Sequence, residues 1–228
     1  MDRKRIFDLA VTLAGAVVWG TALLICSIAI AVCAGFPIFY VSQRRVSSTA
    51  LRPVIKFRTM VRNADRIFNR DTVPVSGNVR FLNAPADSSL YTGIGRLIER
   101  WALTEIPQFL LVLKGDMSIV GNRPLPDNVI ASLREIYPAV DDRFLTPAGM
   151  TGPVQLIGRV EVSDLERLRL EADYCRAALL SRSWRLDLDI LVYTVLIATG
   201  LVRARTLDEV YEILDKYSRR RAENHESR

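Results

Sequence analysis

The feature that most constrains this chain is the segment from Leu9 to Val41, which contains no charged residue. A straight helix from Ile6 to Phe36 would be about 45 Å long at the usual rise per residue, whereas the hydrocarbon core of a bilayer is roughly 30 Å thick. A soluble helix of this composition is excluded. A cleaved signal peptide is a poor alternative, because the apolar run is too long and no small-x-small site precedes a secreted-looking domain. The segment is therefore a membrane element that must tilt, kink or turn back.

The basic residues on both sides of this segment bear on its topology. The motifs DRKR (residues 2–5) and QRR (residues 43–45) flank the two ends, and basic flanks favour the cytoplasmic side of a membrane. This arrangement favours a re-entrant helical hairpin that enters one leaflet, with Gly15, Gly20 and Ser27 as candidate bend positions. A single straight span is the alternative on the residues alone, since Gly and Ser also occur in straight membrane helices.

The overall charge points to an anionic partner. Lys and Arg outnumber Asp and Glu by 31 to 25, which gives a net charge of +6 and favours phosphate, anionic lipid or nucleic acid. The chain has no nucleic-acid recognition motif, and its apolar N-terminal segment argues against that partner. Two of the three cysteines, Cys26 and Cys33, lie in the apolar segment and are expected to be buried apolar residues of a cytoplasm-facing protein rather than a disulfide pair.

The histidine content limits the chemistry. The single histidine, His225, lies in the polar C-terminal tail, which excludes a Ser-His or Cys-His nucleophile and a histidine-ligated zinc site. Any catalysis must use carboxylates, Lys, Arg, hydroxyl groups and a hard cation such as magnesium.

After residue 43 the sequence becomes that of a helix-rich α/β domain. Residues 53–58 are predicted to form a strand, and residues 94–101 and 106–113 to form two helices that meet near Thr104. Further helices are expected at residues 164–176 and 188–202, the second too short to span a bilayer and therefore buried or interfacial. We predict a membrane element (1–43) that is either a re-entrant hairpin or a single span, a cytoplasmic domain (44–205) with interfacial amphipathic helices, and a basic C-terminal helix (206–228), which is either solvated or in contact with anionic headgroups.

The stretch ALTEIPQ (residues 102–108) places one acid, Glu105, in an otherwise apolar region. Helix-capping preferences explain this stretch as the start of a helix, with Thr104 as the N-cap, Glu105 in the first turn and Pro107 where its missing N–H costs little. A first-turn acid is worth about 0.3 to 1 kcal/mol through the helix dipole. The loop that follows at residues 114–124 is rich in Gly, Asp, Arg and Pro, and such loops commonly build sites.

Several motifs, in this order along the chain, resemble those of the bacterial sugar transferases, the monotopic polyprenyl-phosphate phosphoglycosyltransferases. They are KR-FD (4–8), KFRTM (56–60), L-x-E-x-P-Q (103–108), VLKGDMSIVGNRP (112–124), GMTGPVQ-x-x-GR (149–159), Asp173-Tyr174 and D-x-D-I-L…T (187–194). The resemblance implies transfer of a sugar-1-phosphate from a UDP-sugar to undecaprenyl phosphate, with release of UMP and initiation of a polysaccharide or glycan. It implies a re-entrant helix, contact with membrane lipid at the cytoplasmic face of the bacterial inner membrane, and magnesium as the cofactor. A homodimer and partner glycosyltransferases are the candidate protein partners, and the sequence leaves the oligomeric state open.

The resemblance assigns expected roles to individual residues. The family's catalytic glutamate falls on Glu105 and a second essential acid on Asp173. Basic phosphate-binding positions fall on Lys56, Arg58 and Arg123, in line with the need to neutralise a diphosphate and a transferring phosphoryl group. Glu105 and Asp116 are the expected metal ligands. Gln155 and Arg159, from the GMTGPVQ-x-x-GR motif, complete the expected substrate contacts.

One departure from the family pattern is central, because the family's nucleophilic aspartate aligns with Thr104. A neutral hydroxyl is a poor nucleophile without a base to accept its proton. Glu99 stands where the family has an arginine, and Asn122 changes a GPRP motif to GNRP. Three interpretations remain open: Glu105 is the nucleophile, Glu105 supports direct transfer as a base or metal ligand, or the protein is non-catalytic and binds polyprenyl phosphate or a partner transferase.

Overall fold

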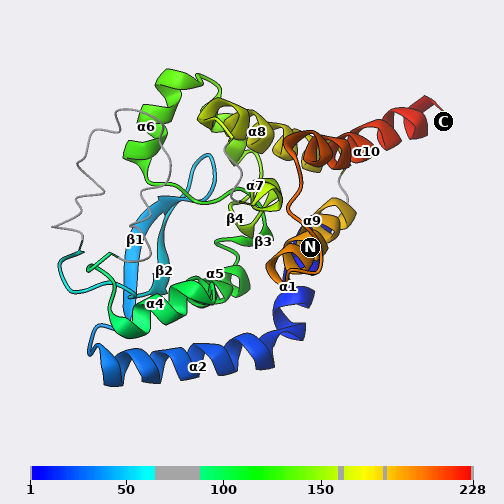
Figure 1. Ribbon diagram of the computed structural model, residues 1–228. Coiled ribbons are helices and arrows are strands. Elements are labelled where there is room, and N and C mark those ends of the chain that lie inside the picture. The colour runs from blue at the N-terminus through cyan, green and yellow to red at the C-terminus, as the bar shows by residue number, and fades with distance from the viewer. Residues whose placement is uncertain (1, 65–87, 159–161, 182–183, 227–228) are drawn as a thin grey trace.

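The computed structural model describes residues 2–64, 88–158, 162–181 and 184–226. Helices dominate, with two small sheets between them (Figure 1). The elements are α1 (Arg3–Ala14), α2 (Ala16–Cys33), β1 (Phe39–Arg45), β2 (Leu51–Phe57), α4 (Gly93–Arg100), η1 (Ile106–Gln108), α5 (Phe109–Lys114), β3 (Ser118–Val120), α6 (Asp127–Ile136), η2 (Val140–Phe144), β4 (Gly149–Thr151), α7 (Pro153–Ile157), α8 (Asp164–Ser181), α9 (Trp184–Ala198) and α10 (Leu207–Glu226). The predicted helix-rich α/β class is confirmed.

The two sheets have different origins in the sequence. Strands β1 and β2 form an antiparallel pair with Phe39 opposite Phe57 and Arg45 opposite Leu51, so the predicted strand at 53–58 is confirmed within a longer hairpin. The boundary drawn at residue 43 falls inside β1. Strands β3 and β4 form a short parallel pair.

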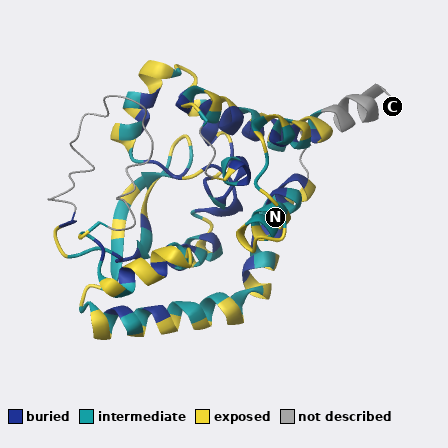
Figure 2. Cartoon of the chain, in the orientation of Figure 1, coloured by how far each residue is buried: buried dark blue, intermediate teal, exposed yellow. Residues whose placement is uncertain are grey.

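The main core lies where α8, α9 and α10 pack around β3, β4 and α7 (Figure 2). Tyr174, Leu156 and Leu186 are fully buried there. A second cluster of buried residues joins α6, η2 and α8, and a third joins α2, β2 and α4. Helix α8 contributes to the first two of these clusters and is buried on several sides, with Leu168, Leu170, Ala172 and Tyr174 all inaccessible to solvent.

Helix α1 is fastened to this core by a buried charge network. The Lys4 ammonium donates to Asp187 Oδ2 at 2.6 Å and to the Val120 carbonyl at 2.8 Å. The Tyr174 hydroxyl donates to Asp187 Oδ1 at 2.8 Å. Asp187 is 3% exposed, and a buried carboxylate requires such partners. Residues of the KR-FD motif and of the motif at 187–194, far apart in the sequence, therefore hold α1 in place.

A second set of contacts joins α1 to the start of β3 and the end of α5. Asp8 is buried and accepts hydrogen bonds from Ser118 Oγ at 2.8 Å and from the Ile119 main-chain N–H at 2.9 Å. Arg5 donates to the carbonyls of Val112 and Leu113 in the last turn of α5, where a helix leaves carbonyls unpaired. The basic residues at the start of α1 therefore pack directly against the folded domain.

The apolar segment is broken at Gly15, which separates α1 from α2; Gly20 and Ser27 lie within α2. The break leaves the Thr12 carbonyl available, and the Trp19 indole N–H donates to it at 2.8 Å. The same indole stacks on Phe109 of α5, with ring centroids 5.3 Å apart. In a membrane every backbone polar group needs such a partner, so the break is compatible with an apolar environment.

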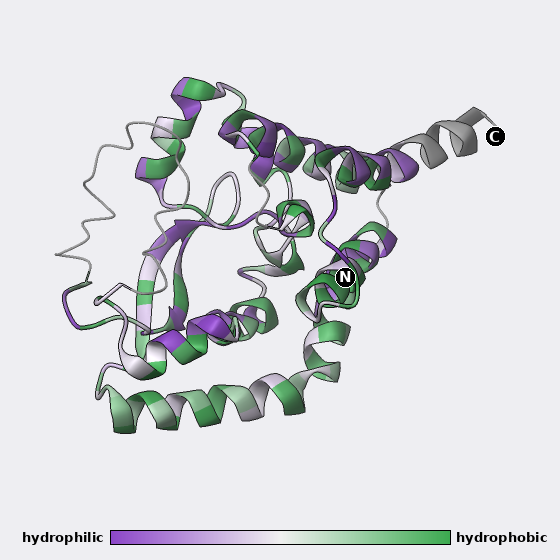
Figure 3. Ribbon diagram, in the orientation of Figure 1, coloured by the Kyte–Doolittle hydropathy of each residue, from purple (hydrophilic) through white to green (hydrophobic). Residues whose placement is uncertain are grey.

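Helix α2 is long and apolar enough to cross a membrane and is the single helix of that kind in the described part of the chain. It runs beneath α4 and α5 (Figure 1) and is predominantly hydrophobic, with a few pale positions between the apolar ones (Figure 3). Its outward residues include Val17, Leu24, Ile28 and Val32, all more than half exposed. The re-entrant placement stays a prediction.

Candidate active site

The segment between α4 and α5 carries Thr104 and Glu105. Ala102 adopts φ +55°, which lets the Leu103 N–H bond to the Ile98 carbonyl at 2.9 Å and closes α4. Glu105, not Thr104, occupies the N-cap position of η1, without a side-chain cap bond. The predicted Thr104 N-cap is wrong by one residue, because the chain first makes a 3-10 turn through Pro107 before α5 begins.

Glu105 is ion-paired with Arg123, which lies in the loop after β3. The two side chains are 27% and 43% exposed, so an acid and a guanidinium meet at a surface that solvent and ligands can reach. Charge-assisted bonds of this type are the geometry with which Arg also binds phosphate. The structure thus brings together two residues that were predicted separately.

The loop that presents Arg123 is held by close backbone packing. The Gly121 N–H donates to the Thr151 carbonyl at 2.7 Å, and the Gly149 N–H donates to the Asn122 carbonyl at 2.9 Å. A Cβ on Gly121 would lie 2.3 Å from the Pro147 carbonyl oxygen, so only glycine fits. The Arg123 carbonyl itself accepts a bond of 3.0 Å from Arg143 Nη2.

Thr104, by contrast, is buried. The residue is 7% exposed and its hydroxyl oxygen has no hydrogen-bond partner. Its carbonyl accepts the Phe57 N–H at 3.0 Å, which ties this segment to the end of β2. Thr104, the position predicted to align with the family's nucleophile, therefore presents no hydroxyl at the surface, whereas the carboxylate of the neighbouring Glu105 is partly exposed.

Comparison with known proteins agrees with the family resemblance of the motifs. Residues 2–200 match the family model described as bacterial sugar transferase. The chain belongs to the bacterial sugar transferase family.

The similar curated proteins support this membership. The chain is 27% identical over 193 residues to the exopolysaccharide production protein ExoY of Sinorhizobium fredii, covering 83% of this chain and 81% of that protein. It is 30% identical to the uncharacterized sugar transferase EpsL of Bacillus subtilis, covering 86% of each. It is 32% identical to the undecaprenyl-phosphate galactose phosphotransferase of Salmonella typhimurium, covering 69% of this chain but 32% of that relative.

Lys56 and Arg58, the two basic residues at the end of β2 that were predicted to bind phosphate, differ in their surroundings. Lys56 lies on β2 with its Nζ 5.2 Å from the centroid of the Tyr40 ring on β1. Arg58 is 8% exposed, and its guanidinium donates to main-chain carbonyls at the exit of α2. Burial lowers the pKa of Arg58 from its usual value, and the nearby Arg62 lowers it further. A phosphate-binding role for Arg58 stays a prediction.

The predicted second acid, Asp173, is ion-paired on its own helix. Asp173 is on α8, 40% exposed, and accepts a bond of 2.9 Å from Arg176, which also pairs with Asp142. Glu171 and Cys175 of the same helix contact Asn122, next to Arg123. Asp173 lies two residues from each of them and therefore points to roughly the opposite side of α8. No contact among the described residues joins Asp173 to the Glu105–Arg123 pair, and its role as a second acid stays a prediction.

Two further predicted substrate contacts come from the stretch that follows β4. Gln155 lies on α7, and its side chain is partly exposed. Arg159 lies outside the described residues.

The predicted metal ligands Glu105 and Asp116 are not adjacent. Helices η1 and α5 lie between them, a length of about 15 Å at the usual rises. Asp116 pairs with Lys114 at 2.8 Å and with Arg52 at 3.0 Å, and the Lys114 ammonium, followed by Arg52, holds the pKa of Asp116 below its usual value. No group of three His, Cys, Asp or Glu side chains suited to a metal occurs among the residues that the structure describes.

We expect Asp116→Asn to destabilise the protein modestly, by up to about 1 kcal/mol, because both of its partners are largely exposed. A lowered carboxyl pKa adds stability that is present above the unfolded pKa of about 4 and is lost as the pH falls through the folded value. The difference between wild type and variant should therefore shrink below pH 4 in thermal unfolding experiments in detergent. Transferase activity within about twofold of wild type is expected if the ion pairs are the role of Asp116; a loss of activity with unchanged stability would instead support metal binding.

The sequence did not reveal a buried network behind the Arg123 loop. Arg143 Nε bonds Glu171 Oε2 at 2.7 Å, with the side chains 1% and 4% exposed. Asn122 Nδ2 donates to the carbonyls of Arg143 and Glu171, each at 2.9 Å. The unusual Asn122 of GNRP was the one available signal, and its amide is here part of the packing between the loop and α8.

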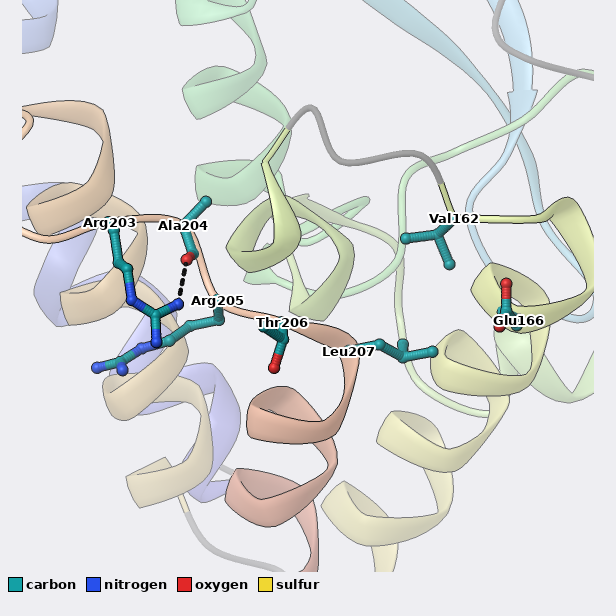
Figure 4. A pocket seen from close by; sticks show the side chains of 7 residues that line it. All are labelled: Val162, Glu166, Arg203, Ala204, Arg205, Thr206 and Leu207. Carbon is teal, nitrogen blue, oxygen red and sulfur yellow. Dashed lines mark hydrogen bonds between the residues drawn. The ribbon is translucent and has the colours of Figure 1, made fainter.

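A pocket of about 290 Å³ lies beside the α9–α10 connection (Figure 4). Val162 and Glu166 line one side, and residues 203–207 line the other. Arg203 bonds the Ala204 carbonyl at 3.1 Å and is ion-paired with Glu209. None of the predicted catalytic residues lines this pocket, so it is not assigned a substrate.

Proposed function

We propose that the chain transfers a sugar-1-phosphate from a UDP-sugar to undecaprenyl phosphate and releases UMP, which initiates synthesis of a polysaccharide or glycan. The observation that carries this proposal is the accessible Glu105–Arg123 pair beside the apolar helix α2. Leu103 and Ile106, on either side of the Thr104–Glu105 dipeptide, pack on the cluster that includes Ile30 of α2. The acid is thus adjacent to the surface from which a lipid phosphate would arrive.

The contacts of α2 support a re-entrant placement at the cytoplasmic face of the bacterial inner membrane. Near its start, Trp19 stacks on Phe109; near its end, Ile30 is fully buried against Phe57 and Ile98. Since both ends lie against one folded body, α2 would lie in one leaflet rather than cross both. Exposed Leu97 and Trp101 at the end of α4 extend the apolar surface, and Trp favours the membrane interface.

In the proposed reaction, a carboxylate oxygen of Glu105 attacks the sugar-bearing phosphorus of the UDP-sugar. The bond from that phosphorus to the bridging oxygen breaks, and UMP leaves with the electron pair. An oxygen of undecaprenyl phosphate then attacks the same phosphorus and displaces the Glu105 carboxylate, which regenerates the enzyme. The burial of the Thr104 hydroxyl favours Glu105 over Thr104 as the attacking group.

Arg123 would exchange partners during this reaction. In the free protein it neutralises Glu105; a bound diphosphate offers the guanidinium a second anion with matching geometry. When Arg123 binds phosphate, Glu105 becomes the more available nucleophile, and the developing charge on the phosphoryl group is stabilised.

At this site a magnesium ion would be held by the partly exposed carboxylate of Glu105 together with oxygens of the diphosphate, which is how Mg²⁺ is often bound. Its contribution would be to neutralise phosphate charge; Asp116, paired with two cations, does not fit the role.

The decisive experiment measures UMP release from membranes that contain the full chain, a panel of UDP-sugars and undecaprenyl phosphate, with and without a chelator. Release with at least one donor is expected, and a known family member serves as the positive control. No release across the panel, with the control active, would overturn the proposal in favour of a non-catalytic member that binds polyprenyl phosphate or a partner transferase.

We expect Thr104→Val to retain UMP release within about threefold and to leave stability unchanged or raised by up to about 1 kcal/mol, because it removes a buried hydroxyl without a partner. Activity and thermal unfolding of the purified protein test this. A loss of activity in a folded variant would show that the hydroxyl takes part. In Thr104→Asp, a marked gain in turnover would indicate that the family's usual nucleophile position has degenerated here.

A further inference from the structure

Arg58 is held almost entirely by main-chain carbonyls. Nε donates to Pro37 at 2.5 Å, Nη2 to Ala34 at 2.8 Å and to Gly35 at 2.5 Å, and Nη1 to Met60 at 3.2 Å. The main-chain N–H of Arg58 also donates to the Ile38 carbonyl at 2.9 Å. Residues 34–38, the chain segment that leaves α2, are thus held by both the side chain and the backbone of one residue.

These carbonyls need a donor of this shape. They lie just after the last turn of α2, where the helix no longer supplies N–H partners, in a segment that is only partly buried. A guanidinium carries five N–H groups in a planar fork, whereas a lysine has three on a single nitrogen. Within the described ranges, no carboxylate is ion-paired with Arg58, so its bonding capacity is directed to the α2 exit.

The residue before Arg58 connects to the catalytic segment. The Phe57 N–H donates to the Thr104 carbonyl at 3.0 Å, one residue before Glu105. The Phe57 ring is fully buried in the cluster that contains Ile30 of α2 and Ile98 of α4, and it stacks on Phe39. The dipeptide Phe57–Arg58 therefore contacts the membrane helix on one side and the Thr104–Glu105 segment on the other.

We propose that Arg58 is a positioning residue, which fixes the exit of α2 against the segment carrying Glu105, rather than a ligand of substrate phosphate. Its effect on transfer rests on the proposed function; its structural effect does not. A change at Arg58 would loosen the link between the membrane helix and Glu105 without removing a phosphate contact.

Arg58→Lys tests this, because it keeps the positive charge but cannot span the carbonyls. In the full chain in detergent micelles, we expect amide hydrogen exchange in peptides covering residues 34–39 and 57–60 to become about tenfold faster or more, while peptides from α8 are unchanged. The matched control is Arg52→Lys on β2, whose Arg pairs with Asp116 and is 46% exposed; it should leave those peptides unaffected. In a transfer assay, Arg58→Lys should lower kcat and leave KM for the UDP-sugar within about twofold.

Unchanged exchange at 34–39 together with a raised KM would overturn the proposal and identify Arg58 as a phosphate ligand. If wild type shows no transfer at all, the proposed function fails while the exchange result still decides the role of Arg58. If Arg58→Lys does not fold, the unsubstituted protein supplies the test through the NMR signal of Arg58 Nε–H. Protection of that proton without any anion, unmoved by added inorganic phosphate, supports positioning; protection only with phosphate overturns it.

Discussion

Glu105→Gln is expected to lower UMP release by about 10³-fold or more, because the amide keeps the size of the side chain but cannot act as an anionic nucleophile. Stability should change little, since the Glu105–Arg123 pair is partly exposed and such pairs contribute roughly 0 to 1 kcal/mol. UMP release from membranes measures the loss. Glu166→Gln, on an exposed acid at the start of α8, is the matched control and should remain active.

Intact-protein mass spectrometry with the donor alone separates the two catalytic interpretations. A phosphosugar adduct in wild type that is absent in Glu105→Gln supports Glu105 as the nucleophile. An active wild type without any adduct supports direct transfer. Full activity of Glu105→Gln would contradict both, and attention would turn to Thr104 or another acid.

Arg143→Met is expected to cost about 3 to 5 kcal/mol of unfolding free energy, because it leaves the Glu171 carboxylate buried without its cation. Arg143 and Glu171 are almost inaccessible to solvent. Thermal unfolding in detergent gives the measurement. Arg134→Met removes a partner from the exposed Arg134–Asp141 pair and should change stability by less than about 1 kcal/mol.

The double variant Arg143→Met with Glu171→Leu separates charge burial from positioning. Replacing both members of a buried pair with apolar groups is often neutral or stabilising, so most of the lost stability should return. The hydrogen bond from Arg143 to the Arg123 carbonyl is lost in both variants, so we expect KM for the UDP-sugar to be raised in the double variant as well as in Arg143→Met. Equal destabilisation by the single and double variants would contradict this account of the pair.

Much of the fold could be predicted from the sequence, because it is encoded locally. Helical spacing of apolar residues located α4, α5 and α10, the apolar run from residue 188 to 202 located α9, a mixed-charge stretch located α8, and the uncharged segment located α2. Strands β3 and β4 have three residues each, too few to show alternation. They exist because Gly121 and Gly149 allow two backbones to approach closely, which is a long-range property.

The sequence predicted which residues belong to the candidate site, but only part of how they are arranged in space. The motifs identified Glu105 and Arg123, and the structure pairs them across 18 positions of sequence. Arg58 and Asp173 were predicted from the same motifs, yet one is buried against the α2 exit and the other is paired on α8. The environment of a charged side chain depends on which distant segments pack against it, and a single sequence does not contain those pairings.

The break at Gly15 has a consequence for adaptation to different membranes. Helices that cross a bilayer commonly adjust to its thickness by changing their tilt. Helix α2 cannot do so freely, because Trp19 is bonded to Thr12 across the break and stacked on Phe109, while its other end is held through Ile30 and the carbonyls bound by Arg58. The insertion depth of the proposed hairpin would therefore be set by the protein, and lipids of different chain length would have to adjust around it.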